Sequence, residues 1–198
     1  MKDTKFIKRL NFNIKENINL KNKIKYKYRE LKLIVEIIYN TIKSGNKVFI
    51  CGNGGSAADA QHLAAEFLVR LKSSSNRRPY PLLSLALDTS TITACANDLG
   101  FENLFARNLR ALANDKDSLI VISTSGNSKN IIKVLDTAKK MRIISIGLLG
   151  NKGGKARKIV NYPLIVPSNN VARIQEAHIF LGHFILSEVE NKLIREKN

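Results

Sequence analysis

The sequence has few cysteines and no long apolar run. Its 198 residues include only Cys51 and Cys95, too few for a disulfide framework, and both are interpreted as buried thiols of a reducing compartment. No segment approaches the roughly 18 consecutive apolar residues of a membrane span. The N-terminus is basic, but no apolar segment of the signal-peptide type follows it. A cytoplasmic protein that does not act at a membrane is therefore expected.

Acidic residues are scarce as well. The chain has 33 lysines and arginines against 16 acidic residues, a formal net charge of +17, and residues 1–50 alone carry 13 basic and 4 acidic side chains. Such an excess can indicate nucleic-acid binding. The basic segment lacks a groove-reading motif, however, and a solvated helix face explains its charge. Nucleic acid is therefore not an expected partner.

No linker, repeat or low-complexity tract divides the chain, and short apolar strands alternate with amphipathic helices. This order predicts an α/β fold with a five-stranded parallel sheet flanked by helices. Strands are expected at residues 47–51, 82–87, 118–123, 143–148 and 164–166, and helices at 4–44, 57–71, 102–113, 129–141 and 171–195, with a polar loop at 73–81 and a loop or short helix at 89–96. Ligands of such folds bind beyond the carboxyl ends of the strands.

A glycine-rich turn follows the first predicted strand. Residues 52–57, GNGGSA, fit the dinucleotide-binding pattern G-x-G-x-x-A between a strand and a helix. That fingerprint also needs an acidic residue about 20 positions later to hold a ribose hydroxyl, and residues 70–75 contain none. A P-loop pattern is absent too. No nucleotide cofactor is expected, and a turn that serves only strand–helix packing remains an alternative.

A hydroxyl-rich turn follows the third predicted strand. Residues 123–128, STSGNS, place four hydroxyls at the start of a helix. Unpaired N–H groups and the helix dipole stabilise an anion at such a helix N-terminus, and the hydroxyls add donors without adding charge. One hydroxyl is explained by helix capping alone, but four in six residues predict a phosphate site.

Two predicted helices carry polar pairs in apolar surroundings. His62 and Glu66 are four residues apart and share a helix face. Gln175 and His183 are eight residues apart, which turns a helix by about 80° and advances it by about 12 Å, so both can face one cleft. A lone histidine is often a core residue. From spacing alone, a catalytic or metal-binding role and a structural one remain equally open.

Four blocks of sequence carry a family resemblance. They read CGNGGSAADAQHLAAEFLVR, LALDTSTITACANDLGFENLFARNLRAL, VISTSGNSKNIIKVL and PSNNVARIQEAHIFLGHFILSEVE. In sequence and order, these blocks closely resemble those of the bacterial phosphoheptose isomerases, which belong to the SIS (sugar isomerase) domain superfamily. The resemblance covers roughly residues 40–190. We accordingly expect residues 41–198 to form one SIS domain and residues 1–40 a helical extension packed on it.

The resemblance implies an aldose–ketose isomerase that converts sedoheptulose 7-phosphate to D-glycero-D-manno-heptose 7-phosphate, a precursor of lipopolysaccharide or capsule heptose. It also implies a homotetramer with active sites at subunit interfaces. The implied phosphate site consists of Ser56, Ser123, Thr124, Ser125 and Ser128. The implied sugar site consists of Asn53, Gly54, Gly55, Asn97 and Asp98, together with His62, Glu66 and Gln175. The set that ligates zinc in some members corresponds to His62, Glu66, Gln175 and His183.

The implied acid/base pair, Glu66 and His183, suits the reaction. Moving a carbonyl between C2 and C1 needs a base that removes a carbon-bound proton, and a carboxylate partly removed from water is a stronger base. Histidine titrates near neutral pH and can shuttle protons between the two oxygens. A divalent cation would stabilise enediolate charge, although the glutamine carbonyl of Gln175 is an uncommon zinc ligand.

Two other functions share the same fold family. The alternative hypothesis is a non-catalytic SIS protein that binds a partner such as a replication initiator, but the presence of both Glu66 and His183 favours the enzyme. A phosphosugar-sensing regulator needs a DNA-binding module, and the first 45 residues are too short for one. The family resemblance implies an acidic residue at position 170, beside the cleft rather than in it, whereas this sequence has Asn170.

Overall fold

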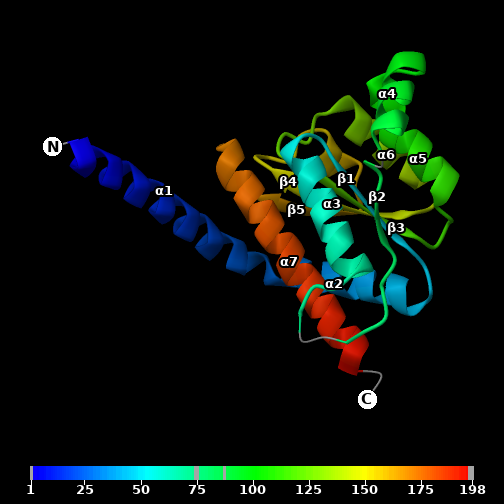
Figure 1. Ribbon diagram of the computed structural model, residues 1–198, viewed down its shortest axis with the longest axis horizontal. Helices are drawn as coiled ribbons and strands as arrows, with labels where there is room; N and C mark the ends of the chain where they lie inside the picture. The colour runs from blue at the N-terminus through cyan, green and yellow to red at the C-terminus, as the bar shows by residue number, and fades with distance from the viewer. Residues whose placement is uncertain (1, 74–75, 87, 196–198) are drawn as a thin grey trace.

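A parallel sheet forms the centre of the molecule (Figure 1). The computed structural model describes residues 2–73, 76–86 and 88–195. Within these ranges, five strands pair in the order β2-β1-β3-β4-β5, all of them parallel. Their bounds are β1 Val48–Gly52, β2 Leu82–Ser84, β3 Ser118–Ser123, β4 Ile144–Gly150 and β5 Tyr162–Val166. The predicted fold class is confirmed.

Helices cover both faces of the sheet. They are α1 Lys2–Ile24, α2 Tyr28–Lys43, α3 Gly55–Leu68, α4 Thr89–Asp98, α5 Leu104–Leu112, α6 Lys129–Lys140 and α7 Val171–Arg195, with 3₁₀ turns η1 Lys25–Lys27, η2 Phe101–Asn103 and η3 Ala156–Lys158. Side chains of a strand alternate between the faces. Val48 and Ile50 of β1 therefore join the core under α2, α3 and α7, whereas Phe49 and Cys51 join the core under α5 and α6.

The single helix expected over residues 4–44 is interrupted. The 3₁₀ turn η1, which buries no residue, separates α1 from α2. Helix α2 packs on α7 and the sheet through residues such as Ile34 and Ile38. Helix α1 instead extends away from the sheet (Figure 1) and buries only Leu20 and Ile24 among its described side chains. The three junction residues, Lys25–Lys27, bury no side chain, so no core packing favours a continuous α-helix there.

The second strand also differs from the expectation. Strand β2 is shorter than residues 82–87, and Leu87 lies outside the described residues, as do Ser74 and Ser75 of the loop expected at 73–81. Residues 89–96, expected as a loop or short helix, lie in α4, which confirms the short-helix alternative. Its first turn is capped by Asp88, whose carboxylate accepts a hydrogen bond of 2.8 Å from the Thr91 amide. In the described residues no helix combines the length and the apolar character needed to cross a membrane.

A buried histidine gives the fold a dependence on pH. His178 of α7 is fully buried, and burial lowers its pKa to about 4. In the unfolded chain the same ring titrates near pH 6.5. Between these two values the unfolded state binds more protons, so the contribution of His178 to stability is complete above pH 6.5 and is lost as the pH falls toward 4.

We therefore predict that the free energy of unfolding falls more steeply between pH 7 and pH 5 in the wild type than in His178→Leu. The difference in that fall should be about 2 kcal/mol. Urea denaturation at the two pH values measures it. Equal pH dependence of the two proteins would contradict the assignment of this effect to His178.

Candidate active site

The candidate site begins where two helices lie side by side. Helices α3 and α7 run in the same direction across one face of the sheet (Figure 1). Gly182 of α7 allows close packing at mid-length, because a Cβ at this position would lie 2.5 Å from Leu63 Cδ1 of α3. Side chains at matching heights of the two helices can therefore meet across a short gap.

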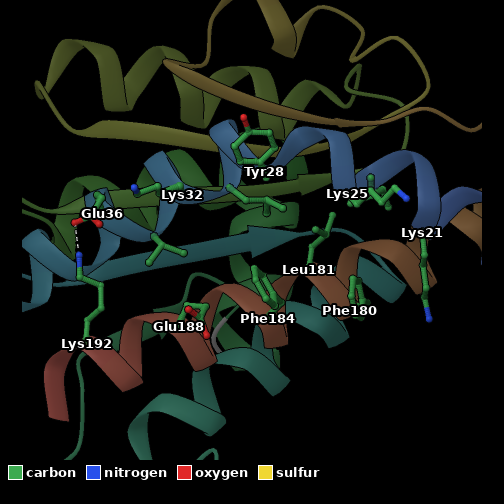
Figure 2. Close-up of a pocket in the computed structure, with 13 residues that line it drawn as sticks. Lys21, Lys25, Tyr28, Lys32, Glu36, Phe180, Leu181, Phe184, Glu188 and Lys192 are labelled. Carbon is green, nitrogen blue, oxygen red and sulfur yellow. Dashed lines mark hydrogen bonds and ion pairs between the residues drawn. The ribbon is translucent and has the colours of Figure 1, made fainter. Parts of the chain in front are cut away.

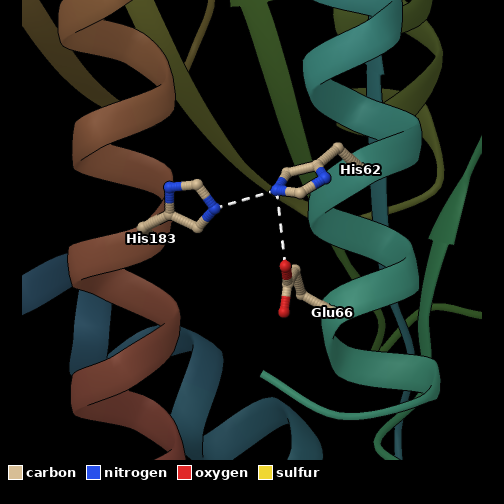
Figure 3. Close-up of side chains that lie close together, drawn as sticks. All are labelled: His62, Glu66 and His183. Carbon is tan, nitrogen blue, oxygen red and sulfur yellow. Dashed lines mark hydrogen bonds and ion pairs between the residues drawn. The ribbon is translucent and has the colours of Figure 1, made fainter. Parts of the chain in front are cut away.

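His62, Glu66 and His183 meet in this gap (Figure 3). Nε2 of His62 lies 2.9 Å from Nε2 of His183 and 3.4 Å from Oε1 of Glu66. One ligand atom from each residue falls within 4.8 Å of those of the other two. The two imidazoles meet edge to face, at an interplanar angle of 86°. The predicted acid/base pair thus occupies one cluster, which the spacing arguments had left undecided.

The cluster is open to solvent in the single chain. The side chain of His62 is 50% exposed and that of Glu66 is 20% exposed. Two imidazole nitrogens at 2.9 Å need either one proton or one cation between them. Ligand atoms of tetrahedral zinc lie about 3.3 Å apart, given Zn–N distances of about 2.0 Å. The separations of 2.9 and 3.4 Å from His62 lie on either side of that value, and the third pair, Glu66 and His183, lies within 4.8 Å.

Gln175, the fourth residue of the expected ligand set, lies at the other end of the helix pair. A Cβ at Gly55 would be 2.5 Å from Nε2 of Gln175, so this amide lies against the first turn of α3. Eight residues of helix separate Gln175 from His183, about 12 Å along the axis. Within one chain, Gln175 therefore faces the glycine-rich turn, whereas the histidine–glutamate cluster forms farther along.

Asp59 is a polar residue near the cluster that was not predicted from the sequence. It precedes His62 by three residues and Glu66 by seven, so it shares their helix face. Its Oδ2 atom is buried and has no hydrogen-bond partner among the described residues. Burial raises the pKa of Asp59, and the nearby imidazoles of His62 and His183 act in the opposite direction. The three-residue spacing from His62 was the available signal in the sequence.

The hydroxyl-rich turn lies between β3 and α6. Ser123 Oγ accepts a hydrogen bond of 3.0 Å from the Gly126 amide, and Ser125 Oγ accepts one of 3.2 Å from the Asn127 amide. Each of these hydroxyls keeps its own O–H to donate. Ser128 stands at the N-cap of α6 but makes no side-chain capping bond. Capping therefore does not explain Ser128.

The segment after β4 braces this turn. Gly126 has a positive φ of 64°, and a Cβ there would clash with the Gly153 carbonyl. The Ala156 amide donates to the Gly126 oxygen at 2.9 Å, and the Lys155 amide donates to Oδ1 of Asn127 at 3.0 Å. The segment after β4 therefore fixes the turn by donating to its acceptors, and the turn's own remaining donors stay available to an anion.

The glycine-rich turn is joined to α6. The side-chain amides of Asn53 and Asn130 exchange hydrogen bonds of 2.9 and 2.7 Å. Gly54 is the N-cap residue of α3, Gly55 begins the helix, and Ser56 is buried in its first turn. This pairing connects the two turns expected to hold the sugar and its phosphate. Asn130 was missed because only its contact with Asn53, 77 residues away in the sequence, reveals it.

Asn97 and Asp98 lie apart from the cluster. They end α4, where Asn97 Nδ2 donates to Asp98 Oδ1 at 2.8 Å. Figure 1 shows α4 at the upper right of the molecule, away from α7. The structure thus brings together Glu66, His62 and His183, and joins the glycine-rich turn to the helix that follows the hydroxyl-rich turn. It leaves Asn97 and Asp98 on a separate surface of the same chain.

Comparisons with known proteins identify the family of the chain. A family model for the SIS domain matches residues 14–150. The phosphoheptose isomerase of Clostridium acetobutylicum is 44% identical over 188 residues, which cover 93% of this chain and 94% of that one. Solved phosphoheptose isomerases of Francisella tularensis and Neisseria gonorrhoeae are similar, with TM-scores of 0.89 and 0.86 at 32% and 34% identity. Each comparison covers 93% of this chain and 98% of the solved one.

A parallel α/β sheet with hydroxyl- and glycine-rich turns at its carboxyl edge defines the class, a SIS domain protein. Within that class, the chain belongs to the phosphoheptose isomerase family.

Proposed function

We propose that this protein interconverts sedoheptulose 7-phosphate and D-glycero-D-manno-heptose 7-phosphate, as an aldose–ketose isomerase of heptose-precursor synthesis for lipopolysaccharide or capsule. The observation that carries the proposal is the meeting of Glu66 with the imidazoles of His62 and His183. A carboxylate and an imidazole from separate helices provide the base and the proton shuttle that the reaction needs.

In the proposed mechanism, Glu66 removes the proton from the carbon next to the carbonyl and returns it to the neighbouring carbon. His183 carries a proton between the two sugar oxygens while an enediol or enediolate forms between them. His62 contacts both groups and orients them. We assign Asp59, with its unpartnered oxygen, to the same polar surface.

The phosphate is assigned to the hydroxyl-rich turn. The N-terminus of α6 offers unpaired N–H groups, and Ser128 leaves its hydroxyl free of capping. We propose that Ser56, Ser123, Thr124, Ser125 and Ser128 hold the phosphate, and that Asn53, Gly54, Gly55 and Gln175 contact the sugar. Neutral donors bind a dianion without adding a net charge that would retain the product.

We predict that Glu66→Gln and His183→Ala each lower kcat by about 100-fold or more, because each removes an acid/base group. Conversion of sedoheptulose 7-phosphate, followed by product analysis, measures the effect. Glu102→Gln, an exposed glutamate of η2, is the matched control and should keep wild-type turnover. Wild-type turnover in both site variants would refute the proposed roles.

We further propose that the cluster holds Zn²⁺. Two histidines and one glutamate form a donor set that catalytic zinc sites use, with a position left for substrate. Bound there, the ion would polarise the sugar oxygens and stabilise enediolate charge. Gln175 remains a proposed ligand from the family pattern, although within one chain its amide lies near Gly55.

Calorimetric titration of the metal-free protein with Zn²⁺ tests this. We predict one site per chain, lost in His62→Ala and in His183→Ala, since each variant removes an imidazole ligand. His178→Leu removes the one other histidine of the sequence and should bind as the wild type does. Equal binding by all four proteins would place the ion elsewhere.

The surface of the chain supports a homotetramer, which we propose as its functional state. An apolar groove of about 550 Å³ lies between α7 and the α1–α2 junction (Figure 2). Phe180 and Phe184 line it although both are exposed, at 41% and 45%. Helix α1 exposes further large apolar side chains: Phe6, Ile7, Leu10, Phe12, Ile14 and Ile18. Neighbouring chains would cover these surfaces and would supply Asn97 and Asp98 to each other's sites.

We predict a particle of about four times the 22.2 kDa chain mass in light scattering. Phe184→Asp should dissociate it, because a charge at an apolar interface is costly, and should lower turnover with it. Leu112→Asp, at an equally exposed position on α5, is the control and should stay tetrameric. A monomeric wild type with full activity would overturn the proposal.

The two cysteines support a cytoplasmic location, which we propose as well. Cys51 and Cys95 are both free and buried. Burial raises the pKa of the Cys51 thiol, so this side chain is inert rather than nucleophilic.

A further inference from the structure

A buried ion pair joins the two helices that carry the proposed base and proton shuttle. Arg77 lies in the loop after α3, and Glu190 lies near the end of α7. The side chain of Arg77 is 4% exposed and that of Glu190 is fully buried. Arg77 Nε donates to the Glu190 carboxylate, whose other oxygen has no partner among the described residues. Neither residue belongs to the acid/base cluster.

The other nitrogens of Arg77 hold the end of α3. Nη2 donates to the Glu66 carbonyl at 2.8 Å, and Nη1 donates to the Phe67 carbonyl at 3.0 Å. Both carbonyls belong to the last turn of α3, where the C=O groups have no hydrogen-bond donor within the helix. The guanidinium also stacks on Tyr80, 4.4 Å from the ring centroid. Arg77 is therefore a side-chain cap at the residue that carries the proposed base.

Glu190 connects this cap to His183. Seven residues, about two turns, separate them on α7, so they lie on nearly the same face. The guanidinium of Arg77 thus contacts the backbone of Glu66 through Nη2 and, through Nε, a side chain of the helix that carries His183. The close approach of Gly182 to Leu63 holds α3 near α7 at the level of the cluster, and the Arg77–Glu190 pair joins the two helices beyond it.

We propose that Arg77 and Glu190 are positioning residues that hold Glu66 at working distance from His183. This inference rests on the proposed function of those two residues. The last turn of a helix frays, whereas reacting groups need placement within about 0.5 Å. Because the phosphate is bound at a different turn, loss of the positioning contact should lower kcat and leave KM nearly unchanged.

Arg77→Lys is the primary test. Lysine keeps the charge and can still reach Glu190, but its single nitrogen cannot also hold both carbonyls as the planar fork does. We predict a folded protein whose kcat falls about 10- to 100-fold, as misplacement of reacting groups by about 1 Å does, with KM within about twofold of the wild type. A folded Arg77→Lys with wild-type kcat would overturn the inference.

The double variant Arg77→Met with Glu190→Leu removes both charges, so that neither is left buried alone. It should fold and show at least the same loss of kcat. Lys133→Met with Glu102→Gln removes the ion pair between α6 and η2 and is the matched control, since neither residue belongs to α3 or α7. Wild-type kcat in the folded Arg77/Glu190 double variant would also overturn the inference. If this variant unfolds, Arg77→Lys decides alone.

A structural readout separates failure of this inference from failure of the proposed function. The sequence has three histidines, so their ring protons are resolvable by NMR. In Arg77→Lys we expect the ring signals of His62 and His183 to shift, because Glu66 moves, and that of His178 to stay. Such shifts support the positioning role even if the wild type proves inactive on the heptose phosphate. Unchanged signals of His62 and His183 contradict the role whatever the activity.

Discussion

The close parallel packing of α3 against α7 is the contact on which the site depends. A side chain larger than hydrogen at position 182 would meet Leu63, so the two helix backbones approach each other at mid-length. That approach brings His62 within 2.9 Å of His183. The sheet underneath contributes by fixing the direction of both helices, because their apolar residues fill one core with β1, β3 and β4. The chemistry therefore rests on backbone proximity that apolar packing maintains.

Local sequence predicted those parts of the site that local geometry determines. The four-residue spacing of His62 and Glu66 placed them on one helix face, and the hydroxyls of residues 123–128 marked a helix start; both features are present. Parallel strand order followed from the alternation of strands and helices. The interruption at η1 was not predicted, because the residues on both sides favour helix and only tertiary packing distinguishes buried α2 from exposed α1.

Contacts between distant residues could not be predicted in the same way. Arg77 and Glu190 are 113 positions apart, and Asn53 and Asn130 are 77 apart. In the sequence, each appears as an ordinary polar residue. The fold pairs them in places where a lone polar group would be costly. The spacing of Asp59 from His62, by contrast, was visible in the sequence. Only the folded chain shows that its Oδ2 atom is buried without a hydrogen-bond partner among the described residues.

The exposure of the cluster connects the chemistry to assembly. An enediolate must be kept from water, because low local polarity strengthens the interactions that stabilise its charge. In the single chain, however, the side chain of His62 is half exposed. The large apolar side chains of α1, and Phe180 and Phe184 of α7, are likewise exposed to solvent in the single chain. A neighbouring copy that buried these surfaces would also limit solvent at the cluster. Catalysis and stability would then impose the same requirement on the surface of α7.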